Sequence, residues 1–305
     1  MSNDPNLQEP DAPDADEAPP SPLAAIVQFF LVPLAVVILA VTVFLVFGYM
    51  THETKGLDDY LQDVRVGKLN RRGQAAYELS LRVAADPEAA RKAGVGPAAL
   101  ALFQDPTLDD PAIKRYLVLV LGALRDPSAT ETLVGALKAD DRDTRKHACF
   151  ALAAIADPAA VDGLVELAKR EEDAEIKKVA IYALGKIGDA RAVPQLEVAM
   201  DDPNPAISWQ AAFSLAECGD PSSRALLRRL LDPTYVAATP RIQSDEQTEI
   251  RLNAVRALAR VAESADLALF ADLGQRDPDL KVRDAALKAA TALAQPTPAA
   301  ATPTP

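Results

Sequence analysis

Apolar and small residues recur at helical spacing through most of the chain beyond residue 56. Aligned segments begin at Ile113, Thr144, Ile176, Ile207, Ile250 and Val282. Their starts are 31, 32, 31, 43 and 32 residues apart. Counted from each start, places 1, 5, 8, 9 and 12 are apolar or small, and these places share one face of an α-helix. A period near 31 suits a pair of short helices, so the pattern predicts an all-α repeat fold.

Turn residues separate the helices at fixed points of each repeat. The long helix is followed by Asp-Pro or a related pair, as at Asp126-Pro127 and Asp157-Pro158. Aspartate caps a helix N-terminus, and proline suits the first helical position. A shorter helix and an acidic loop, such as residues 201–203, then lead into the next repeat. Such a helix pair buries its apolar face only by stacking on its neighbours, so the sequence predicts an α-solenoid.

Other segments depart from this repeat. Residues 57–96 hold two helical stretches, Leu57 to Val66 and Arg71 to Ala85, which we interpret as capping helices ahead of the repeats at 97–294. Together they make about seven helix pairs. The step of 43 residues marks an insertion around Thr234 to Gln247. The acidic residues 1–22 and the Pro-, Ala- and Thr-rich residues 295–305 are predicted to be disordered tails.

An apolar run near the N-terminus predicts a transmembrane helix. Residues 23–50 contain no ionisable side chain, and a helix of that length exceeds the roughly 30 Å of a bilayer core. The acidic start and long run differ from a cleaved signal peptide, so we expect a permanent anchor, followed by a linker over 51–56. Lys and Arg are absent before the run and frequent after it. This predicts a single-pass membrane protein with its N-terminus outside and its repeats in the cytoplasm.

Charge and cysteine content narrow the range of functions. The formal net charge is -12, and an acidic chain is a poor binder of nucleic acid, so we expect no nucleic-acid partner. Cys149 and Cys218 are far apart and lack the spacing of a zinc site or a disulfide framework. We interpret both as small core residues and predict neither a metal nor a cofactor.

The repeat resembles a known family. Residues 179–196, VAIYALGKIGDARAVPQL, are similar to the HEAT-like repeats of the phycobilisome-lyase type, as are the recurring Arg, Leu-Gly and Asp-Pro positions. The resemblance covers roughly residues 57–294 and implies the solenoid fold. It says little about function, because solenoids of this family include scaffolds, lyases and hydroxylases.

The chemistry of these relatives gives a test for an enzyme. HEAT-type hydroxylases that resemble deoxyhypusine hydroxylase hold a di-iron centre through repeated His-Glu pairs. Here the one His-Glu pair, His52-Glu53, lies outside the repeats, and His147 is followed by Ala148. The sequence has no phosphate loop and no serine nucleophile elbow. We predict no enzymatic activity, and a bilin-lyase-like enzyme remains the alternative that the resemblance allows.

Two columns of cations mark the start of the long helices. Place 2 holds Lys114, Arg145, Lys177, Arg251 and Arg283. Cations at a helix N-terminus oppose the helix dipole, so another interaction must hold them there. The resemblance to HEAT repeats implies that these side chains pair with carboxylates of the preceding acidic loops. Place 3 holds Arg115, Lys146 and Lys178. We expect this second column to face an acidic partner.

The face opposite the core carries a stripe of apolar and aromatic residues. Place 7 holds Leu119, Phe150, Tyr182 and Phe213, and Tyr77 extends the series. Trp209 stands at place 3, one turn before Phe213. The resemblance implies that this face lines a concave surface, where exposed apolar patches and aromatic anchors mark interaction sites. The alternative is that the helices are rotated, so that these rings pack between neighbouring repeats.

These patterns predict a membrane-tethered scaffold or adaptor that binds a protein or peptide, with acidic partners favoured, in the concave groove of the solenoid. The predicted contact residues are Arg115, Leu119, Lys146, Phe150, Lys178, Tyr182, Trp209 and Phe213. An accessory subunit of a larger membrane complex is the alternative among binding proteins. A lyase-like enzyme is the alternative from a different class.

Overall fold

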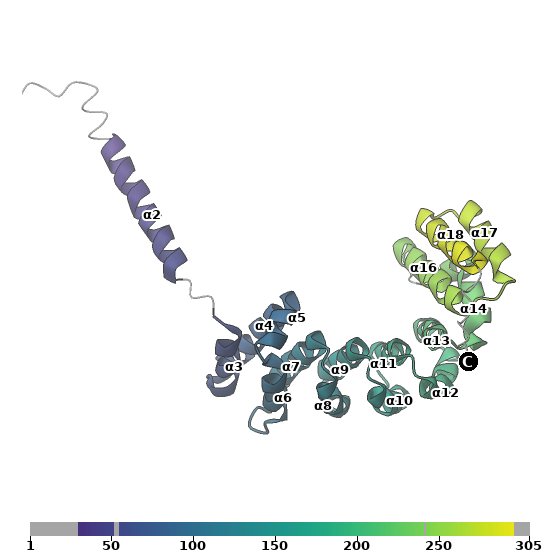
Figure 1. Cartoon of the computed structure of the whole chain (residues 1–305), viewed down its shortest axis with the longest axis horizontal. Coiled ribbons are helices and arrows are strands. Elements are labelled where there is room, and N and C mark those ends of the chain that lie inside the picture. Colours follow the sequence, from purple (N-terminus) through teal and green to yellow (C-terminus); the bar gives the residue numbers. More distant parts are fainter. Residues whose placement is uncertain (1–29, 52–54, 241, 296–305) are drawn as a thin grey trace, which may run out of the picture. The chain divides into compact units, whose positions relative to one another are not determined.

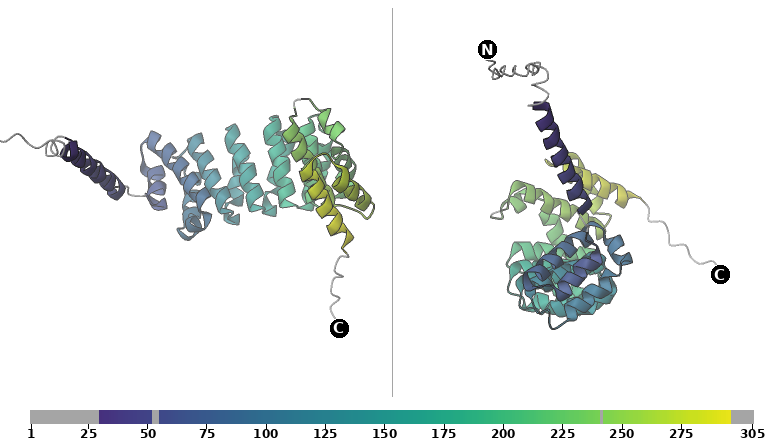
Figure 2. Two further views of the ribbon diagram at one scale, coloured as in Figure 1. Left: turned by 90° about the horizontal axis from the view of Figure 1, so that it is seen from above. Right: turned by 90° about the vertical axis from the view of Figure 1, so that its left-hand side faces the viewer.

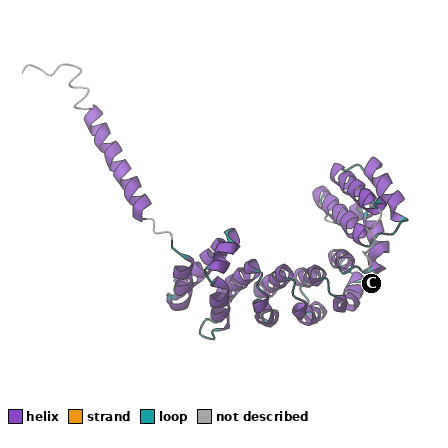
Figure 3. Ribbon diagram, viewed as in Figure 1, coloured by secondary structure: helices purple, strands orange, loops and turns teal. Residues whose placement is uncertain are grey.

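A computed structural model describes residues 30–51, 55–240 and 242–295 of the chain. It divides into two compact units, Met1–Lys55 and Gly56–Pro305. Helices joined by loops make up the described residues, and no strand occurs among them (Figure 3). The predicted all-α solenoid is therefore confirmed.

Among the described residues, the second unit contains seven pairs of helices in a row and two further short helices, Pro87–Lys92 and Pro233–Ala237. Its helices are α3 (Leu57–Val66), α4 (Leu69–Ala85), α5 (Pro87–Lys92), α6 (Val95–Gln104), α7 (Pro111–Leu124), α8 (Thr130–Ala136), α9 (Arg142–Ile155), α10 (Val161–Arg170), α11 (Ala174–Ile187), α12 (Val193–Met200), α13 (Pro205–Glu217), α14 (Arg224–Leu230), α15 (Pro233–Ala237), α16 (Ser244–Arg260), α17 (Asp266–Arg276) and α18 (Leu280–Ala294). The longer member of each pair is α4, α7, α9, α11, α13, α16 or α18, and each of these packs against the next. From α7 onward these longer helices lie along the inner side of the curved row (Figure 1). Figure 2 shows the pairs standing side by side.

Aspartate side chains fix the points where helices begin. Asp141 accepts a hydrogen bond from the backbone N–H of Thr144 at 2.8 Å, which caps α9. Asp173 caps α11 by accepting from the backbone N–H of Glu175 at 2.9 Å. Asp126 accepts a hydrogen bond from the backbone N–H of Ser128 at 2.9 Å, which caps the short 3-10 helix that directly precedes α8. Each cap satisfies an amide that the helix itself leaves unpaired, as the Asp-containing turns predict.

Two clusters of buried side chains meet at α13. The N-terminal cluster runs from Val64 to Leu215, and the C-terminal cluster runs from Trp209 to Ala289. Helix α13 contributes Ile207, Ala211 and Leu215 to the first cluster and Trp209, Ala212 and Ala216 to the second. The core is thus continuous along the row, as a solenoid requires for stability.

The insertion lies just after this junction. Its first part lies in α15, whose Val236 is fully buried in the C-terminal cluster. Its last part forms the first turn of α16. The inserted residues therefore add a short helix to the pair formed by α14 and α16 and extend the local core.

Glycine allows α11 and α13 to approach closely. A Cβ atom on Gly185 would lie 2.5 Å from Ser214 Oγ and 2.7 Å from Ser214 Cα. Ser214 Oγ donates a hydrogen bond to the Ile181 carbonyl at 2.9 Å across the same contact. A larger residue at position 185 would push the two helices apart.

The first unit contains α2 (Val32–Thr51). Large apolar side chains from Phe30 to Val46 are exposed along it. The transmembrane helix predicted over residues 23–50 begins in residues 23–29, which lie outside the described part of the chain. Among the residues that are described, no helix combines the length and the apolarity that crossing a membrane requires. The two predicted tails, residues 1–22 and all but the first residue of 295–305, also lie outside the described residues.

Candidate protein-binding groove

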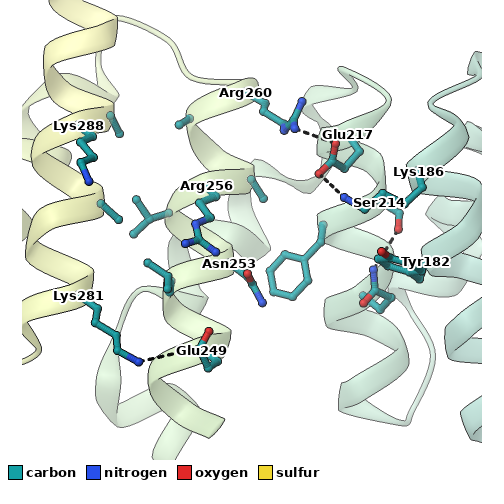
Figure 4. A pocket seen from close by; sticks show the side chains of 18 of the residues that line it. Tyr182, Lys186, Ser214, Glu217, Glu249, Asn253, Arg256, Arg260, Lys281 and Lys288 are labelled. Carbon is teal, nitrogen blue, oxygen red and sulfur yellow. Dashed lines mark hydrogen bonds and ion pairs between the residues drawn. The ribbon is translucent and has the colours of Figure 1, made fainter. Parts of the chain in front are cut away.

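Helices α11, α13, α16 and α18 line a groove of about 950 Å³ (Figure 4). Its walls come mainly from places 4, 7 and 11 of the long helices. Place 4 gives Gln210, Asn253 and Ala285; place 7 gives Tyr182, Phe213, Arg256 and Lys288; place 11 gives Lys186, Glu217 and Arg260. Side chains three and four positions apart share one helix face, so places 4, 7 and 11 form a single stripe. The predicted contact residues occupy places 3 and 7, and those at places 4 and 11 were not predicted, although the helical spacing from place 7 could have revealed them.

Most of the predicted place-7 stripe is accessible to solvent. Leu119 is 36% exposed and Phe150 is 45% exposed, as the sequence predicts. Tyr182 and Phe213 are half-buried and line the groove. The ring centroids of Phe150 and Tyr182 are 6.3 Å apart, so neighbouring repeats present their rings side by side. Tyr77 on α4 is exposed and packs edge-on against Tyr116 on α7, with ring centroids 5.4 Å apart. The aromatic surface thus extends to α4.

Trp209 does not lie on this exposed surface. Only 5% of it is exposed, and it packs within the C-terminal cluster that also includes Val255 and Leu258 of α16. The prediction of a solvent-facing Trp209 is therefore wrong, and packing between repeats holds at this position. The physical reason is the rotation of α13 about its axis. Place 4, which holds Gln210, faces the groove, so the preceding residue, Trp209, faces the core.

The place-3 cations differ from one another in their surroundings. Arg115 forms an ion pair with Asp143 at 3.1 Å, and Lys146 forms one with Glu175 at 3.3 Å. Each carboxylate stands in the first turn of the next long helix. The equivalent position in α13 is Ala206, and Lys178 has no ion pair within the described residues. Two of the three cations predicted to face a partner are thus already paired within the solenoid.

The place-2 cations join successive repeats. Lys114 pairs with Asp109 of the preceding loop at 2.5 Å, as predicted. Arg145 instead reaches Glu171 at 2.9 Å and Lys177 reaches Asp202 at 2.5 Å, in the loops that follow. Because repeats stack side by side, the start of a long helix lies beside the acidic loop of the next repeat. The predicted direction of pairing is therefore wrong for Arg145 and Lys177.

The two remaining place-2 arginines are more enclosed. Arg251 and Asp277, again a carboxylate in the following loop, form an ion pair that is almost fully buried. Arg251 Nε also donates to the Leu231 carbonyl at 3.1 Å. Arg283 Nε is buried without a hydrogen-bond partner among the described residues. The direction predicted for place 2 is wrong at Arg251 too.

Cations gather in the C-terminal part of the groove. Lys186 and Arg260 share Glu217, at 3.4 and 3.0 Å. Lys281 pairs with Glu249 at 3.3 Å, and Lys288 pairs with Asp284 at 2.6 Å. Arg256 is exposed and has no ion pair or hydrogen bond in the part of the chain that the structure describes. Figure 4 shows its guanidinium pointing into the groove beside Asn253.

The two thiols and His147 have shifted pKa values because they are buried. Burial raises the pKa of Cys149 to about 12 and that of Cys218 to about 11, so both remain thiols at neutral pH. Burial also lowers the pKa of His147, which favours its neutral form. Within the described residues, no cluster of three or more His, Cys, Asp or Glu side chains is placed to hold a metal ion.

Part of the repeat region matches a known family model, and several solved structures share the fold. A family model of HEAT repeats matches residues 98–185 and 161–239. The complex of CpcE and CpcF of phycocyanin lyase from Nostoc sp. PCC7120 is similar in structure, with a TM-score of 0.51 and 18% identity over 78% of this chain and 95% of that chain. An engineered protein is similar with a TM-score of 0.52 and 20% identity over 76% of this chain and 67% of that chain. A designed armadillo repeat protein in complex with the peptide (KR)4 gives a TM-score of 0.48 and 18% identity over 68% of this chain and 100% of that chain. No curated protein matches the sequence. Residues 98–239 are therefore similar to HEAT repeats, and the likeness to solved structures concerns the fold.

Proposed function

We propose that this protein is a scaffold or adaptor whose groove holds an extended segment of a protein partner. The observation that carries the proposal is the row of apolar and aromatic side chains presented by successive long helices. Leu119 and Phe150 are exposed, and Tyr182 and Phe213 extend the row into the groove. Such a row offers regularly spaced contacts to an extended chain.

The energetics of this surface favour binding. Each apolar side chain that a partner covers contributes roughly 25 cal/mol for every Å² removed from water. The rings stand on packed helices, so little side-chain or backbone freedom is lost when a partner docks. Aromatic residues on rigid elements are common anchors in interfaces. The similar fold in the complex of CpcE and CpcF supports binding to another protein, by analogy alone.

A lyase-like enzyme is the second candidate, and its support is confined to that same analogy of fold. The thiols are protonated at neutral pH, and the groove is lined by apolar side chains, amides and charged side chains that, apart from Arg256, are paired. None of these side chains is arranged as a nucleophile beside a base. The binding role is therefore the proposal that the arrangement of side chains favours.

Membrane attachment is a separate part of the proposal. Its support is the run of residues 23–50 without an ionisable side chain and the exposed apolar side chains from Phe30 to Val46. A tether would raise the effective concentration of a partner at the membrane. Retention of the chain in membranes after alkaline extraction would support it, and release into the supernatant would contradict it. A phosphatase fused to the C-terminus should be inactive if the repeats are cytoplasmic.

Proximity labelling in the native host tests the binding role. We expect the double variant Phe150→Ala, Tyr182→Ala to lose specific labelled partners, because it removes two adjacent rings from the row of place-7 side chains. Val198→Ala is the matched control, since Val198 is 68% exposed on the shorter helix α12. Partners lost in the double variant and kept in the control are then tested for direct binding to the purified chain. Identical partner sets for all three proteins would contradict the proposal.

A further inference from the structure

We infer that the groove contains a subsite for a carboxylate, centred on Arg256, so that the partner segment carries a glutamate or aspartate next to an apolar residue. The inference rests on the proposed function and specifies what the groove recognises. It concerns the part of the groove formed by α13, α16 and α18.

Arg256 is the cation that the groove leaves unengaged. Lys186 and Arg260 share Glu217, while Lys281 and Lys288 each have a carboxylate of their own. Arg256 stands at place 7, where α11 and α13 carry Tyr182 and Phe213. A guanidinium in that place contacts whatever covers the rings. Because it has no internal partner in the described residues, a carboxylate can bind it without first displacing another.

The charge of the groove also favours an acidic segment. Five cationic side chains line it, against the three carboxylates of Glu217, Glu249 and Asp284. This local excess of positive charge contrasts with the net charge of -12 for the whole chain. A concave surface with an excess of one sign of charge attracts and orients a partner of the opposite sign.

The neighbours of Arg256 define the rest of the subsite. Asn253 lies one turn earlier on α16 and lines the same groove, with its side chain beside Arg256 in Figure 4. Its amide can donate a further hydrogen bond to a bound oxygen. Phe213 lines the groove as well, and its ring offers an apolar contact for a residue adjacent to the carboxylate. A carboxylate with an apolar neighbour therefore matches both kinds of surface.

The donor set fits a carboxylate better than a phosphate group. One guanidinium can hold the two oxygens of a carboxylate through two parallel hydrogen bonds, and the single charges cancel. A phosphate group carries about -1.5 to -2 charges and three acceptor oxygens, so it suits a cluster of arginines. Only one unpaired guanidinium is available here within the described residues.

The test measures the affinity of the full chain, in mild detergent, for two end-blocked fluorescent peptides. One is a dodecapeptide of alternating glutamate and leucine, and the other has glutamine in place of glutamate. We expect the glutamate peptide to bind about tenfold more tightly at low salt, as charge-assisted hydrogen bonds imply. Arg256→Gln should remove most of this difference, because the other four cations of the groove are already paired, and should leave the affinity for the glutamine peptide unchanged.

Two further variants make the test specific. Arg276→Gln is the matched control, because Arg276 is exposed on α17 and pairs with Asp272 away from the groove. It should leave the difference intact. Asp284→Asn should strengthen binding of the glutamate peptide, because it removes a carboxylate from the groove and frees Lys288.

The outcomes separate the inference from the proposed function. Equal affinity for both peptides, with binding lost in Phe213→Ala, would overturn the carboxylate subsite and leave the binding groove standing. Failure of both peptides to bind would overturn both. A phosphoserine and leucine peptide that binds more tightly than the glutamate peptide, in an Arg256-dependent manner, would overturn the choice of a carboxylate.

Discussion

The N-terminal and C-terminal halves of the row of long helices use places 3 and 7 differently. In the N-terminal half, on α7, α9 and α11, place 7 carries apolar or aromatic side chains and place 3 carries cations. In the C-terminal half, on α13 and α16, place 3 holds Trp209 and Leu252, which are buried. There place 7 changes from Phe213 in α13 to Arg256 in α16. Place 3 thus becomes apolar between α11 and α13, and place 7 becomes cationic one repeat later, between α13 and α16.

This difference shows that the repeats keep their spacing while their faces change role. Arg115 and Lys146 are satisfied by carboxylates in the next long helix, so the charged groups of the N-terminal half hold repeats together. In the C-terminal half, apolar side chains join the repeats at place 3, which leaves a cation on the groove surface. The N-terminal half of the row thus offers rings, and the C-terminal half adds an unpaired cation to the ring of Phe213.

The largest expected effect separates Trp209 from Phe150. Trp209→Ala should lower the free energy of unfolding by about 4 kcal/mol, because it leaves a cavity at the junction of the two clusters. Phe150→Ala should change stability by less than about 1 kcal/mol, since its ring is already half exposed. Urea unfolding followed by circular dichroism measures both. Similar losses of unfolding free energy in the two variants would contradict the distinction between the buried ring of Trp209 and the exposed ring of Phe150.

The buried ion pair of the C-terminal half should be the next most sensitive feature. Arg251→Ala leaves the Asp277 carboxylate buried and unpaired, and we expect a loss of about 3 kcal/mol. Arg145→Ala should cost less, because the pair with Glu171 is more accessible to water. Both are measured by urea unfolding.

A double variant isolates the buried charge. Arg251→Met with Asp277→Asn removes both charges and keeps an acceptor for the backbone N–H of Asp279, which now bonds to Asp277 at 2.9 Å. It should recover most of the stability lost in Arg251→Ala. A double variant as unstable as the single one would show that packing, and not the unpaired charge, sets the cost.

These contacts also mark how far the sequence could predict the structure. The repeat period and the Asp-containing turns specify the helices and their stacking, because core and cap positions depend on local spacing. The burial of Trp209 was not predictable in this way. A side chain at place 3 lies near the boundary between core and groove, so a small rotation of α13 decides its environment. Likewise, Glu171 lies 26 residues from Arg145 and became its partner through stacking.

A glycine contact between the halves should have an intermediate effect. Gly185→Ala places a methyl group against the backbone of Ser214 and should destabilise the chain by about 2 kcal/mol. Gly135→Ala is the matched control, because open space surrounds that position in α8. It should stabilise the chain by roughly 0.5–1 kcal/mol through helix propensity. Thermal unfolding of both variants gives the comparison, and a neutral Gly185→Ala would show that α11 and α13 can separate without cost.

The smallest effect concerns the pH dependence of the N-terminal half. The pKa of Asp141 is lowered, chiefly by the hydrogen bond from the Thr144 hydroxyl at 2.6 Å. A lowered pKa means that the charged cap stabilises the folded chain above the ordinary pKa of 3.8, and that this contribution is lost as pH falls through the folded value. Asp141→Asn keeps an acceptor at the cap but cannot titrate. At pH 7 it should be less stable than the natural chain by less than about 1 kcal/mol.

That difference should shrink as the pH is lowered from 7 through the lowered pKa of Asp141, because protonation removes the advantage of the natural carboxylate. Urea unfolding at a series of acidic pH values measures it, and Asp140→Asn in the same loop controls for a general change in charge. A difference that does not shrink with falling pH would mean that the geometry of the cap, and not its charge, stabilises α9. In that case the charge of the Asp141 carboxylate would contribute little to the stability of the N-terminal half. The contrast with the C-terminal half would then depend on the residues at places 3 and 7 alone.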